Sequence, residues 1–206
     1  GVTTLTVGTG VATLGYAAFA NMHRLVTVNY NAILVADLTE KQDIFYCGAA
    51  YVSGFTLTIG NQVTRIPSYL FYPRIDDLAA CSPKIKTLTF ASTTAFKSIG
   101  QYAFYYVDDL DGTVQLPNST ETIETYAFYN CTGIDVLKIG TRATGTSMTF
   151  NGKLGTIGTK AFENTTSLNT VEINTAVSCD IAADAFKAAG SSATSTALVI
   201  DINVKT

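Results

Sequence analysis

The side chains that most catalytic sites require are scarce in this sequence. His23 is the single histidine, whereas triad, Cys–His and zinc-water mechanisms use a histidine as base or ligand in nearly every version. It follows Phe19 by four residues, in an expected loop, so we expect its ring to be solvated. The glycines of Gly8-Thr9-Gly10 lack the spacing of a nucleotide-binding loop. We therefore expect a protein without enzymatic activity and without a cofactor.

Acidic residues in two segments offer a different chemistry, because clustered carboxylates are oxygen ligands for calcium. The two segments occupy nearly matching places in successive repeats of the chain, so stacking of the repeats would bring them together. The residues are Asp76 and Asp77 in the first segment and Asp108, Asp109 and Asp111 in the second. The alternative, which we favour, is a solvated acidic edge without a resident metal.

The cysteines give no sign of a metal site or of a disulfide framework. Cys47, Cys81, Cys131 and Cys179 are widely spaced, and none forms a Cys-x-x-Cys pair. Zinc sites and small disulfide-rich domains both show closer spacing. Cysteine is also a small hydrophobic residue that is often buried. We expect four free thiols and no intramolecular disulfide.

The composition favours a folded, strand-rich domain. Hydrophobic residues make up 47% of the 206 residues and charged residues 14%, which excludes intrinsic disorder. Threonine is abundant, and its β-branched side chain favours extended structure. The net charge is −3 and the basic residues are not clustered, which argues against a nucleic-acid partner. No apolar run approaches the roughly 18 residues of a membrane span, so we expect no membrane insertion.

One short motif recurs along the chain, with an aliphatic residue five positions before a phenylalanine. Its copies are Leu14–Phe19, Ile66–Phe71, Ile99–Phe104, Ile123–Phe128, Ile157–Phe162 and Ile181–Phe186. Phe128 follows Phe104 by 24 residues, and Phe45 lies halfway across the longest interval, in a degenerate coil over residues 31–54. We expect Phe104, Phe128 and Phe162 to be fully buried in one ladder.

Each unit also contains a short strand with alternating apolar residues, such as Leu57-Thr58-Ile59. A unit of about 24 residues cannot bury its apolar face alone, whereas stacked units form a continuous core. The sequence therefore predicts an α/β repeat: a single leucine-rich-repeat solenoid over residues 1–206, of about six to seven coils. Short parallel strands should lie on one face and short helical turns on the other. Further insertions are expected near residues 72–84, 141–153 and 189–197.

The best copy of the repeat runs from Ile123 to Ile139, with Cys131 three residues after the phenylalanine. Its pattern resembles the BspA-type leucine-rich repeats of bacterial surface proteins, and the resemblance covers nearly the whole chain. It implies a non-enzymatic recognition or adhesion module at the cell surface or outside the cell. It also implies a host or neighbouring-cell protein or glycan as partner. The alternative is a structural spacer without a ligand of its own. An expected strand begins directly after Gly1, so we interpret the missing signal peptide as a trimmed start.

Tyrosines supply the first candidate binding surface. In three central units they occupy the positions two before and one after the phenylalanine, which share one face of a helical turn. The six residues are Tyr69, Tyr72, Tyr102, Tyr105, Tyr126 and Tyr129. The last two units carry Lys160/Glu163 and Asp184/Lys187 there, as expected of exposed ion pairs. Tyrosine suits protein interfaces and stacking on sugars. Our hypothesis is that this patch docks a glycan, a protein or a second copy; the alternative is that the rings lie flat on neighbouring coils or cover the insertion at residues 72–84.

Outward strand positions supply a second candidate face. It comprises Thr56, Thr58, Thr87, Thr89, Thr113, Gln115 and Lys138. Hydroxyls in register across a sheet could bind a glycan or a peptide. Threonine is equally a good solvent-facing strand residue, and cross-strand threonine pairs support a sheet.

Overall fold

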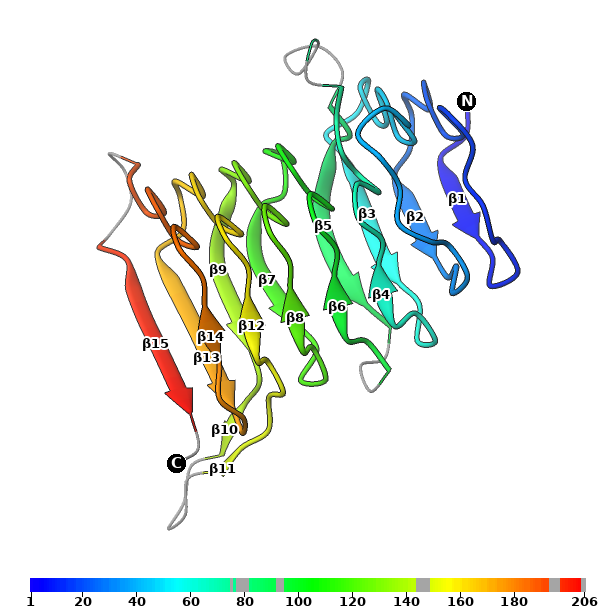
Figure 1. Ribbon diagram of the computed structural model, residues 1–206. Coiled ribbons are helices and arrows are strands. Elements are labelled where there is room, and N and C mark those ends of the chain that lie inside the picture. The colour runs from blue at the N-terminus through cyan, green and yellow to red at the C-terminus, as the bar shows by residue number, and fades with distance from the viewer. Residues whose placement is uncertain (75, 77–81, 92–94, 144–148, 193–196, 205–206) are drawn as a thin grey trace.

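The chain winds into a solenoid whose termini lie at opposite ends of the stack, as the ribbon of the computed structural model shows (Figure 1). The structure describes residues 1–206 except 75, 77–81, 92–94, 144–148, 193–196 and 205–206. Along the chain, a long strand is followed by a short strand and then by the turns that carry the repeated phenylalanine. The coils therefore have a long-strand side, a short-strand side and a turn side.

The long strands form two parallel four-stranded sheets. The first has the order β1-β2-β3-β5 and consists of β1 (Thr4–Val7), β2 (Thr27–Tyr30), β3 (Phe55–Ile59) and β5 (Ile85–Phe90). The second has the order β7-β9-β13-β15 and consists of β7 (Gly112–Leu116), β9 (Ile134–Ile139), β13 (Thr170–Thr175) and β15 (Val199–Val204). Seven coils begin at β1, β2, β3, β5, β7, β9 and β13, and β15 follows the last of them.

The short strands form a third parallel sheet, of order β14-β12-β8-β6-β4. They are β4 (Arg65–Ile66), β6 (Ser98–Ile99), β8 (Thr122–Ile123), β12 (Thr156–Ile157) and β14 (Asp180–Ile181). Each ends on the isoleucine of the repeated motif. A separate antiparallel pair, β10 (Arg142–Ala143) and β11 (Thr149–Phe150), lies in the expected insertion at 141–153.

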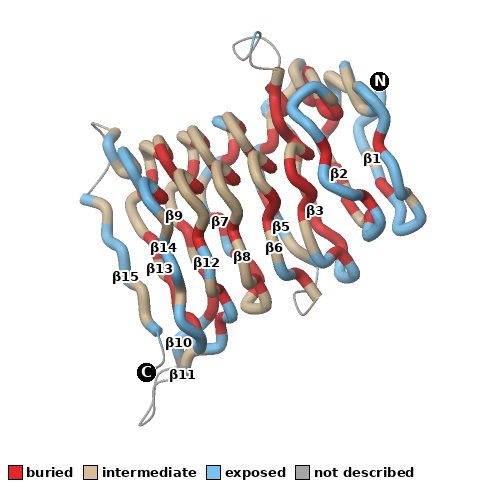
Figure 2. Tube along the Cα trace, viewed as in Figure 1, coloured by how far each residue is buried: buried red, intermediate tan, exposed pale blue. Residues whose placement is uncertain are grey.

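Phenylalanine rings stack along the interior of the solenoid. Phe104 lies 5.0 Å from Phe128, and Phe128 lies 5.1 Å from Phe162, between ring centroids. All three side chains are fully buried, which confirms the predicted ladder. Phe45 of the degenerate segment also takes its place, 4.9 Å from Phe71. Buried residues therefore follow the inside of every central coil (Figure 2).

The predicted helical turns are not confirmed, since the described residues contain no α-helix. Tyr102 and Tyr106 on either side of Phe104 have left-handed backbone angles, φ 57° and 55°, which an α-helix does not accommodate. The backbone N–H groups instead bond to the next coil. Phe104 N donates to Ala127 O at 2.8 Å, and Tyr106 N donates to the carbonyl of Tyr129 at 2.9 Å. Hydrogen bonds between stacked coils, rather than within a local helix, therefore satisfy the backbone N–H groups of the turns.

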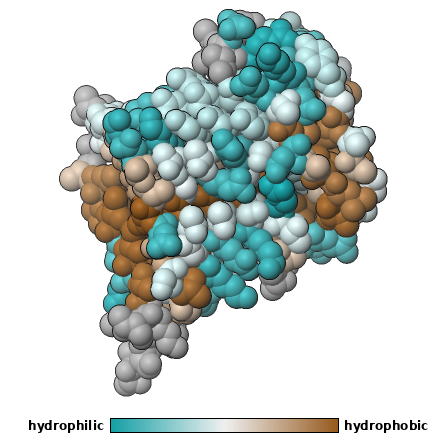
Figure 3. Space-filling view, in the orientation of Figure 1, coloured by the Kyte–Doolittle hydropathy of each residue, from teal (hydrophilic) through white to brown (hydrophobic). Residues whose placement is uncertain are grey.

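Apolar side chains are exposed at the two ends of the solenoid (Figure 3). Leu34 lies towards the amino-terminal end and is 58% exposed, and Val199 in β15 at the other end is also 58% exposed. No coil of the described chain packs against the outer edge of β15. Among the described residues, no helix is long and apolar enough to cross a membrane.

Candidate binding surface

The turn side positions the tyrosines through the buried phenylalanines. In each central coil the tyrosine two residues before the phenylalanine has a positive φ: Tyr69 60°, Tyr102 57° and Tyr126 58°. Its backbone N–H donates to the following coil, as Tyr102 N does to Thr125 O at 3.2 Å. Because the same turn is repeated in register, equivalent tyrosine rings come to lie above one another.

The six predicted tyrosines form two parallel rows, which together we call the tyrosine surface. In the first row, Tyr102 stacks on Tyr69 at 4.9 Å and on Tyr126 at 4.8 Å, with interplanar angles of 23° and 9°. In the second row, Tyr105 stacks on Tyr72 at 5.2 Å and on Tyr129 at 5.0 Å. The two rows meet edge to face within each coil. The structure therefore brings together all six residues.

Tyr106 is a seventh member that the repeat pattern does not include. Its ring lies 4.8 Å from Tyr105 and 5.6 Å from Tyr129. It stands two residues after Phe104, a left-handed position that Asn130 and Asn164 occupy in the next two coils. The doubled tyrosine at 105–106 is visible in the sequence, but its place in the surface depends on this turn geometry.

The tyrosine surface presents ring edges and hydroxyls rather than ring faces. Each central ring is covered on both faces by its neighbours, and Lys160 Nζ lies 5.7 Å from the centroid of Tyr126 at the end of one row. Tyr72 is only 8% exposed, and the other rings are half-buried. At the end of the second row, Asn164 Nδ2 donates to the Tyr129 hydroxyl at 3.3 Å. Stacking of a sugar ring on these faces is therefore blocked along most of the surface.

Burial raises the pKa of five of the six predicted tyrosines. Desolvation, with smaller contributions from Glu40 and neighbouring tyrosines, raises the pKa of Tyr72 to about 12. Desolvation also raises the pKa of Tyr69, Tyr102, Tyr105 and Tyr129. A neutral phenol both donates and accepts hydrogen bonds. The surface therefore offers a regular set of uncharged donors and acceptors.

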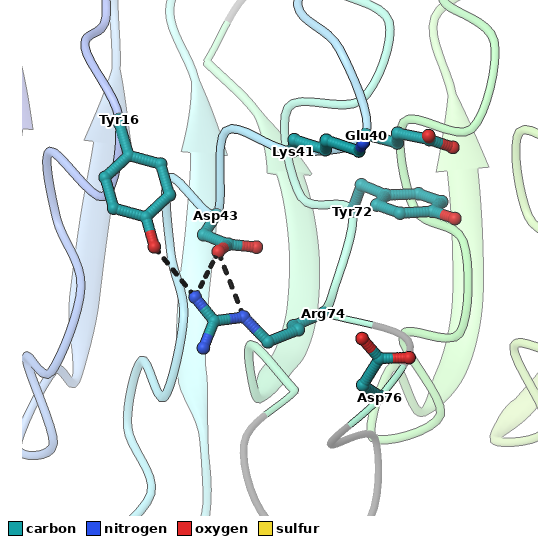
Figure 4. Close-up of a pocket in the computed structure, with 7 residues that line it drawn as sticks. All are labelled: Tyr16, Glu40, Lys41, Asp43, Tyr72, Arg74 and Asp76. Atoms are coloured by element: carbon teal, nitrogen blue, oxygen red, sulfur yellow. Dashed lines mark hydrogen bonds and ion pairs between the residues drawn. The ribbon is translucent and has the colours of Figure 1, made fainter.

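A charged pocket of about 490 Å³ adjoins the tyrosine surface at Tyr72 (Figure 4). On one wall, Arg74 Nε donates to Asp43 Oδ2 at 3.1 Å and Arg74 Nη2 donates to the Tyr16 hydroxyl at 2.8 Å. Arg74 also lies 4.4 Å above the ring of Tyr46. Asp43 is buried, and a buried carboxylate requires such a partner.

Unpaired charges line the rest of this pocket. Glu40, Lys41 and Asp76 are exposed, and none makes an ion pair with a described residue. Asp43 stands two residues before Phe45, the place that Tyr69 takes in the next coil. The degenerate coil therefore carries an aspartate where the next coil carries a tyrosine. The first row of rings ends beside the charged pocket.

The ion pairs predicted in the last two units are present, but one of their members is buried. Lys160 Nζ lies 3.1 Å from Glu163 Oε2, and Lys187 Nζ lies 3.8 Å from Asp184 Oδ2. Glu163 is 6% exposed and is approached also by Lys187, at 3.5 Å. The two lysines balance its buried charge.

The second candidate face lies on the two long-strand sheets and not on one. Thr56 pairs with Thr87 and Thr58 with Thr89 in the first sheet, where the Thr58 and Thr89 hydroxyls are 3.0 Å apart. The other members lie in the second sheet. Thr113 pairs with Val136 there, and Gln115 pairs with Lys138. Lys138 Nζ lies 3.3 Å from Glu172.

Two of the five acidic residues considered for calcium are paired with lysines. Lys84 Nζ lies 3.8 Å from Asp109, and Lys86 Nζ lies 2.5 Å from Asp111. Burial, and then the charge of Asp109, raises the pKa of Asp108. Asp76 lines the charged pocket, and Asp77 lies outside the described residues. Within the described part of the chain, no group of three or more acidic, histidine or cysteine side chains is arranged to hold a metal ion.

Two expectations about single residues need correction. Cys47 is disulfide-bonded, whereas Cys131 and Cys179 are free, so the prediction of four free thiols is wrong. Cys81 lies outside the described residues. His23 is half-buried rather than fully solvated, because its ring stacks on Tyr51 at 4.4 Å.

Comparison with known proteins identifies the repeat. The family model of the BspA type leucine-rich repeat region matches the chain in 6 copies, over residues 1–135, 74–188 and 140–203. No curated protein matches the chain. No solved structure matches it either.

Proposed function

Because the chain belongs to the BspA-type leucine-rich repeat family, we propose that it is a non-enzymatic recognition module of a cell-surface or extracellular protein. Its partner is another protein, and the tyrosine surface is the docking site. The observation that carries the proposal is the pair of stacked tyrosine rows, with their neutral hydroxyls, beside a charged pocket.

A protein fits this surface better than a glycan. Sugars usually dock on the open face of an aromatic ring, whereas ring stacking between coils covers these faces. Tyrosine edges and hydroxyls are favoured at protein interfaces, where they add contact area with little loss of conformational entropy. The unpaired charges of Glu40, Lys41 and Asp76 add a polar rim.

The structural spacer is the alternative, since stacked tyrosines also stabilise the turn side. The last two units of the repeat argue against the spacer. There the same two positions carry Lys160 with Glu163 and Asp184 with Lys187, so the coils stack without tyrosine at these places. Tyrosine at these positions is therefore not required for coils to stack, which favours a second role for the rings in binding.

The disulfide at Cys47 supports the proposed location. Disulfides persist in oxidising compartments, such as the cell exterior, and are rare in the cytosol. A surface or extracellular protein accommodates such a bond.

An array experiment separates the binder from the spacer. The labelled protein is applied to immobilised extracellular proteins and to neutral and acidic glycans, beside the variant Y102F/Y105F/Y126F/Y129F. Phenylalanine keeps the stacking and removes only the hydroxyls. We expect the wild type to bind proteins and the variant to lose those signals. Light scattering on the free protein shows whether the partner is a second copy. An array without protein signals would favour the spacer, and signals on glycans alone would contradict the choice of partner.

A further inference from the structure

The parallel pairing of the long strands stops in the middle of the solenoid, between β5 and β7 (Figure 1). The coils that carry these strands remain stacked on the other two sides. Ile99 of β6 pairs with Ile123 of β8, and Phe104 stacks on Phe128. Each of the two sheets therefore has an inner edge strand, although the chain on either side is continuous solenoid.

Contacts between Lys86 and Asp111 join the amino-terminal ends of the two strands. Asp111 N donates to Lys86 O at 3.2 Å, and the Lys86 and Asp111 side chains form an ion pair. This backbone bond is the first step of a parallel ladder. In the described structure the ladder does not continue beyond it, because β5 and β7 belong to separate sheets.

Backbone N–H and C=O groups of β5 and β7 point into the gap between the two strands. Successive residues of a strand direct their N–H and C=O groups to opposite sides. Asp111 N points to β5 and Gly112 N points to Gly133, next to β9. By this alternation, Thr113 and Gln115 of β7 direct their backbone groups towards β5. Ala91 N donates to Ile59 O in β3, so the backbone of Phe90 points towards β7.

A cleft of about 570 Å³ lies at this interruption, within the range of ordinary ligand sites. Leu88 and Leu116 are among its buried lining residues, 5% and 1% exposed. Thr89 and Gln115 are exposed beside them, and Phe90 is half-buried. None of the described side chains that line the cleft carries a charge.

We propose that this cleft binds an extended, uncharged peptide segment of another protein, which adds as a strand to the free edge of β7. A strand backbone is the ligand that complements a row of free N–H and C=O groups at strand spacing. Alternate side chains of the peptide meet the apolar lining, and the others point to solvent. A charged segment would find no counter-charge in the lining. The proposal concerns the long-strand side and does not rest on the tyrosine surface.

Proline at position 115 tests the backbone contact. Gln115 N–H faces the cleft, and proline is tolerated on an edge strand where the N–H has no ladder partner. The matched control is Gln115→Ala, which removes the side chain and keeps the N–H. Peptides are selected from a phage-displayed random short-peptide library on the wild-type protein, and the best are synthesised for fluorescence-anisotropy titration. Amide hydrogen exchange of the wild type with and without peptide gives a readout that needs no variant.

We expect the selected peptides to be uncharged. Their affinity should fall on the order of tenfold in Gln115→Pro, as loss of one backbone hydrogen bond requires. In Gln115→Ala it should fall by less than about threefold. Peptide binding should slow exchange at the amides of Thr113 and Gln115. Failure to select any peptide, equal affinity for Gln115→Pro and wild type, or slowed exchange only at the turn side would each overturn the proposal.

Discussion

The ring of Tyr102 lies parallel to the ring of Tyr126 in the next coil, with centroids 4.8 Å apart and planes 9° apart. The same relationship joins Phe104 to Phe128, at 5.0 Å and 6°. One repeated turn thus builds two kinds of aromatic stack. The phenylalanines form the core, and the tyrosines form a surface whose ring faces are already in contact.

Replacing Tyr102 by serine should destabilise the fold, because its ring stacks on both Tyr69 and Tyr126. We expect a loss of about 2–4 kcal/mol in the free energy of unfolding. Tyr102→Phe keeps both stacks and should change stability by less than about 1 kcal/mol. Urea unfolding followed by circular dichroism measures both. Equal stability of the serine and phenylalanine variants would show that the ring stacks contribute little.

Truncation of a phenylalanine in the buried ladder should lower the free energy of unfolding more at the centre of the ladder than at its end. Phe128 is fully buried between Phe104 and Phe162, so Phe128→Ala should lose about 3–5 kcal/mol. Among the described rings, Phe186 stacks on Phe162 alone, and it is half-buried, so Phe186→Ala should lose clearly less. Chemical unfolding of the two variants gives the comparison. A loss below about 1 kcal/mol for Phe128→Ala would contradict the register of the ladder.

The glycine after the aliphatic residue of the repeat should be required only where a neighbouring coil packs against it. A Cβ atom on Gly100 would lie 2.4 Å from Ser68 N, whereas one on Gly15 would meet nothing within 4 Å. Gly100→Ala should therefore lose at least about 1–3 kcal/mol. Gly15→Ala should be neutral or slightly stabilising, since it restricts the unfolded chain. Thermal unfolding of both variants is the test, and similar melting temperatures would be inconsistent with close coil stacking.

Alkaline pH should weaken the fold through the tyrosine surface. The pKa of Tyr72 is raised to about 12 in the folded chain, from an ordinary value of 10.0. The folded state then holds the proton more tightly, so this contribution is complete below about pH 10 and is lost as the pH rises towards about 12. Tyr72→Phe has no such proton and should show a shallower loss. Urea unfolding at a series of alkaline pH values measures the slopes, and parallel slopes would contradict the assignment.

The sequence predicts the solenoid well because burial of Ile99, Phe104 and their equivalents dictates one repeat. The sequence also predicts that the six tyrosines lie together, although it assigns them to helical turns that the structure does not contain. Positions three apart share a face in a helix, but consecutive turns with left-handed tyrosines place them equally close. Tyrosine is disfavoured at positive φ, and bonds to the next coil, such as Tyr102 N to Thr125 O, help to stabilise this conformation.

Features that depend on departures from the repeat could not be predicted in the same way. Arg74 and Asp43 come from irregular segments and meet only because their coils are adjacent. The cleft between β5 and β7 arises where one ladder fails to form, although Thr87, Thr89 and Thr113 look alike in the sequence. The alternation of polar and apolar residues in β5 and β7 is the same as in β3, which pairs on both of its edges.

The most direct test of the proposed function uses one protein found on the array. Its dissociation constant is measured for the wild type and for Y102F/Y105F/Y126F/Y129F, and the two values are compared. Tyr51, outside the two rows and 72% exposed, gives the control Tyr51→Phe. We expect the fourfold variant to bind at least about tenfold more weakly, since it loses several interfacial hydrogen bonds. Its free energy of unfolding should fall by no more than about 1–2 kcal/mol, since the bond from Asn164 to the Tyr129 hydroxyl is lost. Tyr51→Phe should bind like the wild type. Equal affinity of the fourfold variant and the wild type would contradict the tyrosine surface as the docking site.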